Sequence, residues 1–428
     1  MFRADIEASL RRDYGEDGRL FPAYGSYCFG NVPDTVGSVL DADGRPRLPD
    51  AGRRRPLPDA GHRRPLPGDV FEGVRTDVET VVLVLVDGYG LDSWKRDRDR
   101  HAFVDRVTER GRVTPLTSIY PSETAAAITT LETGQLPCEH GRIGWNVYEP
   151  ETDRSFVALD GKIKAGGPEG EAAPEANDGE SGFYEGLRRA GVDVHRLQPF
   201  EGETPGVTQH TYEDLQGFGR RLRDVVAASD DPGYVYAYLP HIDHVSHAEG
   251  TDSDAFQDVL GGVCGELAAF VDGLDSETAR ETLLLVAADH GHVNTDPAAN
   301  VDLSDREEVV GNLRRYGDGT PVKMSGSPRN THLHLQEGTV AETRRALSDL
   351  DARCFTRPEA LDRGLFGDRE VSERFRRRCG DLVLTHRELG TWWGDAESDE
   401  LDLVGMHGGL HPAEMLVPFA AVRADRLG

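Results

Sequence analysis

The chain has 428 residues, with 76 aspartates and glutamates against 48 lysines and arginines and a net charge of −28. This acidic excess disfavours nucleic acids and anionic membranes as partners, because both would repel the protein. Four of the basic residues are lysines, and all the others are arginines. Since an acidic, lysine-poor surface suits very high salt, where ions screen self-repulsion, we expect a halophilic, cytoplasmic protein.

The five cysteines are scattered without C-x-x-C spacing, which indicates neither a disulfide framework nor a thiolate zinc site. The first residues lack the apolar core of a signal peptide, and no window is long and apolar enough to span a bilayer. We therefore expect a soluble protein without a membrane partner. The sequence leaves the formation of a homo-oligomer open.

Residues 1–75 are predicted to form an N-terminal extension. A short amphipathic helix with Ile6 and Leu10 comes first, and a near-repeat, LPDAGRRRP and LPDAGHRRP, starts at Leu48 and at Leu57. Because segments so rich in Pro, Gly and Arg cannot bury a core, the repeat is expected to be a surface loop. A basic docking tag is the alternative.

Residues 81–86, VVLVLV, form an unbroken apolar run that predicts a buried parallel strand ending at Asp87-Gly88. Ligands bind at the carboxyl ends of such strands, so Asp87 is a candidate metal ligand. The alternative is an aspartate that only caps the next helix.

A helix is predicted for the run AAAITTLE, which follows Ser122-Glu123-Thr124 and stops at Thr133-Gly134. Thr124 then lies at or near a helix N-terminus, where free N–H groups and the helix dipole favour a phosphate or a partly ionised threonine. A helix cap formed by Ser122 or Thr124 is the structural alternative.

Two further clusters of acids and histidines follow predicted strands. Asp243 and His247 come after YVYAYLP at i,i+4 spacing, so they share one helical face, whereas His241 and His244 lie on other faces. Surface histidines on an acidic protein are the alternative to a metal site there.

Asp289-His290 ends the run TLLLVAA, and an adjacent Asp-His pair on a strand-end loop can bind one ion. His292 and Asn294 are expected to hold these ligands through hydrogen bonds. Near the C-terminus, glycines flank His407 and let the backbone fold closely around an ion. His411, before a proline, is expected to be peripheral.

Residues 301–377 interrupt this pattern with a strand-helix-strand unit and are predicted to be an inserted small α+β subdomain. Arg329, in Ser327-Pro328-Arg329, is a candidate clamp for a phosphate or another part of the substrate. A surface arginine without such a role is the alternative.

The motif order, VDG after a strand, PSET before a helix, TG…P…HG, D-x-x-x-H, ADHG and HGG…P…EM, resembles that of the alkaline phosphatase superfamily. It is most similar to the type I phosphodiesterase/nucleotide pyrophosphatase branch, over residues 76–300 and 378–425. The resemblance implies an α/β fold, a three-layer sandwich with a mostly parallel central sheet. Residues 76–300 and 378–428 would form the catalytic domain, with residues 301–377 inserted.

The resemblance also implies a two-metal site with Thr124 as the nucleophile. Two divalent ions are expected, zinc first, with manganese or iron as alternatives. One ion would be held by Asp87, Asp289, His290 and Thr124, and the other by Asp243, His247 and His407.

The sequence departs from the family at Ala127, where many nucleotide pyrophosphatases have an asparagine that holds a phosphate oxygen. Nucleotide specificity is therefore not implied. Arg142, Trp145 or Asn146 are the residues that we expect to shape the substrate pocket instead.

The expected function is a two-metal phosphoric ester hydrolase that forms a phospho-threonine and cleaves phosphodiester or phosphoanhydride bonds of a small-molecule phosphate ester. The alternatives within the superfamily are a phosphomonoesterase, a phosphonoacetate hydrolase-like enzyme and a metal-dependent phosphomutase, for which Ser122 would be the nucleophile to test. A metal-binding module without turnover is an alternative from another class.

Overall fold

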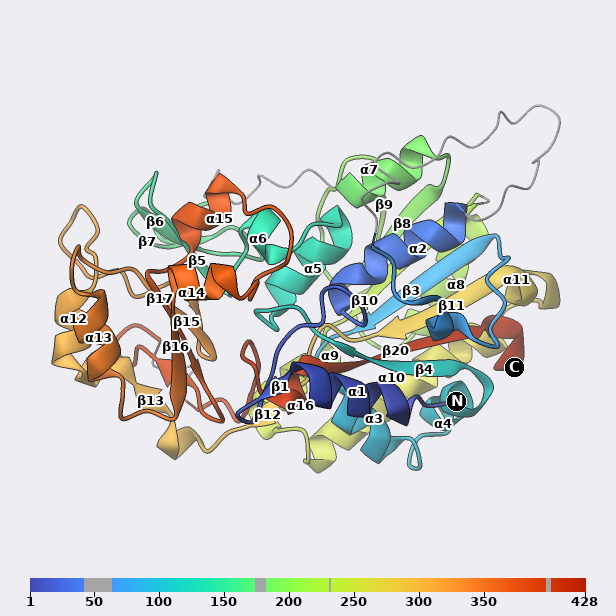
Figure 1. The fold of residues 1–428 in the computed structure, drawn as a ribbon. Helices are drawn as coiled ribbons and strands as arrows, with labels where there is room; N and C mark the ends of the chain where they lie inside the picture. Colours follow the sequence, from blue (N-terminus) through green and yellow to red (C-terminus); the bar gives the residue numbers. More distant parts are fainter. Residues whose placement is uncertain (42–63, 174–181, 231, 398–401) are drawn as a thin grey trace.

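The computed structural model describes residues 1–41, 64–173, 182–230, 232–397 and 402–428. Two lobes lie side by side, each built around a seven-stranded sheet (Figure 1). The strand order is β4-β20-β11-β3-β10-β8-β9 in the large lobe and β16-β17-β15-β14-β5-β6-β7 in the small lobe. Most of the nine-residue repeat, and residues 174–181, lie outside the described residues.

The large sheet is mostly parallel. Five neighbouring strands, β11, β3, β10, β8 and β9, run parallel, whereas β20 is antiparallel to both β11 and β4. Every residue of the three central strands is buried, as expected for apolar strands covered on both faces. The strands are β3 (Thr80–Val86), β4 (Arg112–Thr117), β8 (Asp193–Gln198), β9 (Thr208–Thr211), β10 (Gly233–Leu239), β11 (Thr282–Ala287) and β20 (Leu416–Arg423).

Helices cover both faces of the large sheet and complete three layers, which confirms the predicted α/β class (Figure 1). On one side, α5 packs against α2 and α7; on the other side, α10 packs against α4, α8 and α9. These helices are α2 (Val32–Asp41), α4 (Ala102–Arg110), α5 (Thr124–Thr133), α7 (Gly182–Arg189), α8 (Phe218–Ala228), α9 (His241–Glu249) and α10 (Asp254–Asp272).

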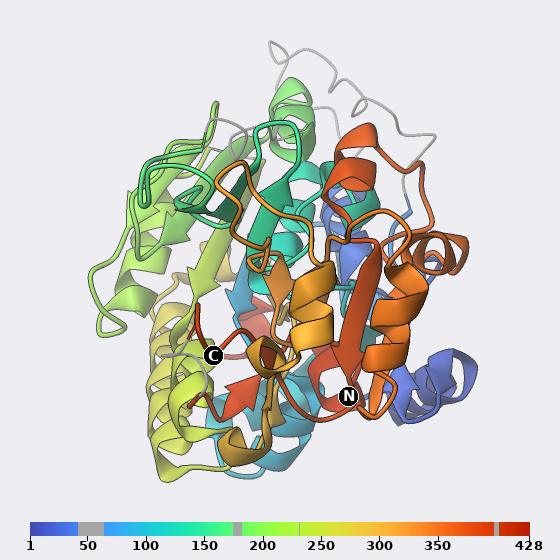
Figure 2. The same ribbon diagram turned by 90° about the vertical axis from the view of Figure 1, so that its left-hand side faces the viewer.

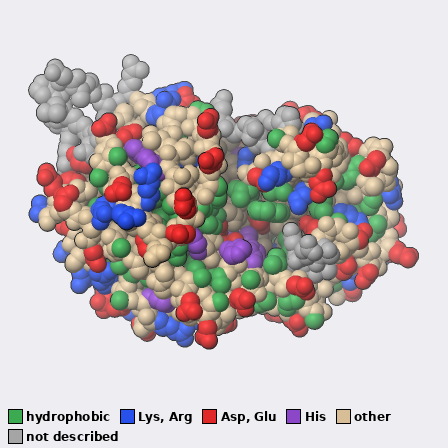
Figure 3. Space-filling view, turned by 180° about the vertical axis from the view of Figure 1, so that it is seen from behind, with side chains coloured by type: hydrophobic (Ala, Val, Ile, Leu, Met, Phe, Trp, Pro, Cys, Tyr) green, Lys and Arg blue, Asp and Glu red, His purple; other side chains and the backbone are tan. Residues whose placement is uncertain are grey.

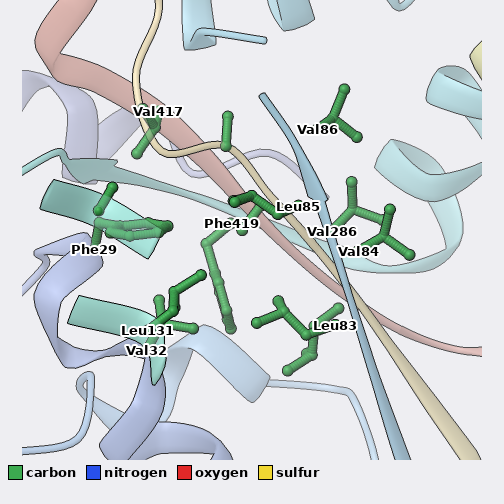
Figure 4. Close-up of a cluster of buried hydrophobic side chains, with 14 of the residues drawn as sticks. Phe29, Val32, Leu83, Val84, Leu85, Val86, Leu131, Val286, Val417 and Phe419 are labelled. Carbon is green, nitrogen blue, oxygen red and sulfur yellow. The ribbon is translucent and has the colours of Figure 1, made fainter. Parts of the chain in front are cut away.

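The first part of the N-terminal extension, residues 1–41, packs on the large lobe. Helix α1 (Ala4–Tyr14) buries Ile6 and Leu10, as its periodicity predicts. Further along, Phe29 and Val32 are fully buried and pack with side chains of the central strands (Figure 4). Residues 1–41 therefore complete the core of the large lobe, because burying their apolar side chains removes apolar surface from water.

The small lobe draws its sheet from more of the chain than residues 301–377. The strands β5 (Asn146–Glu149), β6 (Arg154–Val157) and β7 (Ile163–Ala165) form an antiparallel meander, and Asn146 pairs with Gly326 of β14. The insertion and the returning chain add β14 (Gly326–Ser327), β15 (Asn330–Leu333), β16 (Ala352–Thr356), β17 (Leu382–His386), α12 (Glu307–Asn312), α13 (Val340–Ala346), α14 (Arg357–Asp362) and α15 (Glu373–Arg378). Figure 2 views this lobe end-on.

A buried ion pair joins the two lobes. Arg329, between β14 and β15, places Nη2 2.7 Å from Oε1 and Nε 2.8 Å from Oε2 of Glu414 in α16 (Pro412–Met415). Both side chains are fully buried. Burial alone would raise the pKa of Glu414, but the charge and hydrogen bonds of Arg329 hold this pKa below its usual value. Arg329 is therefore not the substrate clamp that the sequence suggested.

Replacing Arg329 with methionine should destabilise the protein by about 3–5 kcal/mol, because Glu414 is then buried without its counter-ion. Urea unfolding measures the change in the free energy of unfolding. Arg345→Met, at an exposed position in α13, is the matched control. The double variant with Glu414→Leu should recover much of the loss, and an unchanged urea midpoint for Arg329→Met alone would contradict this account.

Candidate active site

The acids and histidines of the sequence motifs converge at the carboxyl ends of the central strands. Asp87 directly follows β3, Asp289 and His290 lie just beyond β11, and α9 starts two residues after β10. Parallel strands end at the same edge of a sheet, which brings their following residues together. Histidine side chains gather in the hollow between the two lobes (Figure 3).

Thr124 is the first residue of α5, and its hydroxyl faces the motif residues. Its Oγ1 lies 3.0 Å from Nε2 of His290 and 3.3 Å from Oδ1 of Asp87. Helix α5 ends at Gly134, whose φ of 72° allows the left-handed cap that the sequence predicted. The N–H groups of the first helical turn therefore lie beside a hydroxyl and two potential metal ligands.

Ser122 is turned away from this cluster. Its hydroxyl donates to the carbonyl oxygen of Gly409, at 2.9 Å, and accepts from the N–H of Gly408 at 3.2 Å. These two bonds tie Ser122 to the loop after His407, so the geometry favours Thr124 over Ser122 as a nucleophile.

The first acidic group consists of Asp87, Asp289 and His290. Nε2 of His290 lies 3.3 Å from Oδ1 of Asp87 and 3.6 Å from Oδ2 of Asp289. Tyr238 donates its hydroxyl to Asp87. Burial and then the charge of Asp87 raise the pKa of Asp289 to about 8, and its Oδ2 has no hydrogen-bond partner among the described residues. Two buried carboxylates beside each other destabilise their charged forms, and a bound cation would relieve this cost.

The second group surrounds Asp243 with three imidazoles. Oδ1 of Asp243 lies 3.4 Å from Nε2 of His247, 3.5 Å from that of His407 and 3.0 Å from that of His292. The Nε2 atoms of His247 and His407 are 3.2 Å apart. Ligand atoms of Asp87, Asp243 and His290 also lie within 4.8 Å of one another, so the two groups adjoin.

The same three imidazoles are oriented by the backbone. In each, Nδ1 faces a carbonyl oxygen, which can only accept, so Nδ1 carries a proton and Nε2 is directed at Asp243. The oxygens belong to Gly405, Ser122 and Gly88, at 2.6, 3.0 and 3.1 Å from His247, His407 and His292 respectively. Three Nε2 atoms and a carboxylate that converge in this way fit a borderline divalent ion, which would bind Nε2 in its deprotonated form.

His292 and Asn294, which the sequence suggests as supports for the metal ligands, lie in different surroundings. His292 contacts Asp243, and Gly88, at φ 71°, leaves room for its ring, since a Cβ there would lie 2.3 Å from Cε1 of His292. Asn294 instead accepts from the N–H of Thr251 at 3.0 Å, and so holds the chain after α9. His411 caps α16, in a peripheral position as predicted.

A cavity of about 240 Å³ opens beside Thr124. Trp145 and Asn146 line it, whereas Arg142 donates to the carbonyl of Ala158 and does not line the cavity.

Sequence reasoning missed Glu123, although it stands within the PSET motif. Its side chain is 3% exposed, and burial raises its pKa to about 7. The lining residues are Glu123, Thr124, Trp145, Asn146, Asp243, His247, Ser327, Pro328, Trp392, Glu397, Leu403, Met406 and His407.

The described residues contain no helix with both the length and the apolar character needed to cross a bilayer.

Among curated proteins, an uncharacterised pyrophosphatase/phosphodiesterase of Schizosaccharomyces pombe is 26% identical to this chain over 247 residues, which are 53% of this chain and 48% of the relative. The chain thus spans about half the length of this curated relative.

Solved structures share the fold. Murine ectonucleotide pyrophosphatase/phosphodiesterase 5, in complex with AMP, superposes with a TM-score of 0.61 at 19% identity, over 80% of this chain and 88% of that one. Phosphonoacetate hydrolase from Sinorhizobium meliloti gives 0.56 at 18% identity, over 82% and 94%. The family described as type I phosphodiesterase/nucleotide pyrophosphatase matches residues 81–410, most of the sequence, and the chain therefore belongs to this family.

Proposed function

We propose that the protein is a two-metal phosphoric ester hydrolase that acts through a phospho-threonine at Thr124. The observation that carries the proposal is the position of the Thr124 hydroxyl at the start of α5, 3.0 Å from His290 and 3.3 Å from Asp87. Membership of a metal-dependent family of phosphodiesterases and pyrophosphatases supports hydrolysis of a phosphoester.

The two residue groups are proposed to hold one divalent ion each. Asp87, Asp289, His290 and Thr124 would bind the first, and Asp243, His247 and His407 the second. Bound there, the ions would favour the ionised threonine hydroxyl and neutralise the phosphoryl oxygens. Zinc is the proposed metal, with manganese or iron as alternatives, since the donors are carboxylates and imidazoles without a thiolate.

The protein side chains then set the geometry of phosphoryl transfer. Asp87, held by Tyr238, and His290 orient the Thr124 hydroxyl, while the N–H groups at the start of α5 bind phosphoryl oxygens. Oγ1 of Thr124 bonds to phosphorus as the bond to the leaving oxygen breaks on the opposite side. Water then attacks the phospho-threonine, returns the hydroxyl and releases the phosphorylated product.

Thr124→Ala should lower kcat/KM for bis-p-nitrophenyl phosphate by at least roughly 1,000-fold, because no other hydroxyl occupies its position. Thr124→Ser should keep part of the activity. Ser122→Ala, which removes the hydroxyl bound to Gly409, should cost less than about tenfold and serves as the control for disturbance of this loop. Substantial turnover by Thr124→Ala would refute the assignment.

Removal of metal should abolish turnover and lower the melting temperature. Ligand binding adds about 2.7 kcal/mol of stability when the free ion is at 100 times its Kd. Calorimetry in EDTA, and then with zinc, manganese or iron added back, measures this shift without an activity assay.

His407→Ala should reduce the metal-dependent rise in melting temperature, whereas His411→Ala, at the peripheral helix cap, should not. A melting temperature that does not respond to any of the three ions would contradict the proposed metal site.

A further inference from the structure

A second cavity opens where an N-terminal hairpin meets the small lobe. The hairpin consists of β1 (Gly15–Glu16) and β2 (Arg19–Leu20), and Asp17-Gly18 joins the two strands with φ angles of 51° and 73°, as a tight two-residue turn requires. The cavity has a volume of about 520 Å³ and shares no lining residue with the cavity beside Thr124. Its lining residues are Asp17, Arg19, Asp351, Ala352, Arg353 and Arg387.

Arg19 is a buried cation without a counter-ion. The residue is 6% exposed, and no carboxylate of the described residues forms an ion pair with it. Its Nη1 donates to the carbonyl oxygen of Asp17 at 3.3 Å, whereas its buried Nε has no hydrogen-bond partner in the described part of the chain. Burial and then the charge of Arg387 lower the pKa of Arg19, because both disfavour the charged form. A bound anion would relieve both costs.

The carboxylate closest to Arg19 along the hairpin is taken by other arginines. Glu16 stands opposite Arg19 in the strand register, where an ion pair across the strands is the usual arrangement. In the structure, however, the two carboxylate oxygens of Glu16 accept from Arg353 and Arg363 of the small lobe. Glu16 therefore fastens the hairpin to the small lobe and leaves Arg19 unpaired.

The two aspartates that line the cavity also lie beside other arginines. Oδ1 of Asp351 is 3.1 Å from Nη2 of Arg387, and Oδ2 of Asp17 is 3.8 Å from Nη1 of Arg353. The Nε of Arg387 is buried and, like that of Arg19, has no hydrogen-bond partner among the residues that the structure describes. With three arginines against two aspartates, the cavity lining keeps one net positive charge.

The free donors have the form that an oxyanion needs. The Nε and one Nη of a guanidinium present two parallel N–H groups, which match two oxygens of a phosphate or a carboxylate. Since Nη1 of Arg19 is used by Asp17, the edge formed by Nε and Nη2 remains. Arg19 belongs to the hairpin, whereas Arg387 follows β17 of the small lobe. An anion that contacts both arginines would therefore bridge the two parts.

We propose that this cavity binds a small oxyanion, a phosphate or a carboxylate, through Arg19 and Arg387. The cavity adjoins the contact between the lobes, because the carbonyl oxygen of Arg387 accepts from Nη2 of Arg329 at 3.0 Å. The N–H of Leu20 donates to the carbonyl oxygen of Leu410 at 2.7 Å, in the loop before α16. The bound oxyanion strengthens this contact and raises the melting temperature. The proposal does not depend on the hydrolase function.

Isothermal titration calorimetry of the full-length protein tests the proposal. Sodium phosphate and sodium acetate are titrated separately, with sodium chloride holding the ionic strength constant, so that the two arms distinguish a phosphate from a carboxylate. We expect saturable binding in at least one arm. Arg19→Leu should weaken this binding at least about tenfold, through the loss of charge-assisted hydrogen bonds. Arg12→Leu, at an exposed position in α1, makes the same change of net charge and should leave the Kd unchanged.

Arg387→Gln is the second variant and keeps the test independent of how well the Arg19 variant folds. The Arg387 side chain is 40% exposed, so its replacement leaves no buried charge, and binding should weaken at least about fivefold. Phosphate bound at the proposed metal site would be retained in all the variants, so the differences between variants report on the arginines.

The proposal is overturned if neither oxyanion binds the wild-type protein, or if Arg19→Leu and Arg387→Gln both keep the wild-type affinity. Because the readout is binding, neither result depends on turnover at Thr124.

Discussion

The structure depends on three carboxylates that meet at one edge of the large sheet, the buried Asp87 and Asp289 and the half-buried Asp243. Burial raises the pKa of Asp87 and of Asp289, because each carboxylate loses the hydration of its charged form, whereas the neighbouring histidines lower the pKa of Asp243. The neighbouring imidazoles of His247, His292 and His407 direct their Nε2 atoms at Asp243. Cations bound as we propose would stabilise such a site, which would link metal binding to the rigidity of this edge of the sheet.

The second constraint is the contact between the lobes. Besides pairing with Arg329, Glu414 accepts from the N–H groups of Gly409, at 3.0 Å, and His411, at 2.7 Å. The ion pair therefore also supports the loop that carries His407. Arg329, which the sequence suggests as a substrate clamp, acts indirectly. Through Glu414 it fixes the backbone that carries His407, a potential metal ligand.

The small lobe supplies much of the cavity lining, while the large lobe carries the candidate metal ligands and Thr124. Trp145 and Asn146 come from the chain around β5, and Trp392 comes from the returning chain after β17. All three face a site whose acids and histidines lie mostly at strand ends of the large lobe. In the proposed function, the large lobe would carry out the chemistry and the small lobe would select the organic group of the substrate.

The sequence by itself determined the α/β class, the buried central strands and the acids and histidines that gather at their ends. These features are local, since an apolar run sets a strand and the next residue must lie at its carboxyl end. Only the tertiary structure decided the pairing of Arg329 with Glu414, the burial of Glu123, the contact of His292 with Asp243 and the place of residues 1–41 in the core. Each of these depends on which distant segments meet, and motif spacing along the chain carries no information about such contacts.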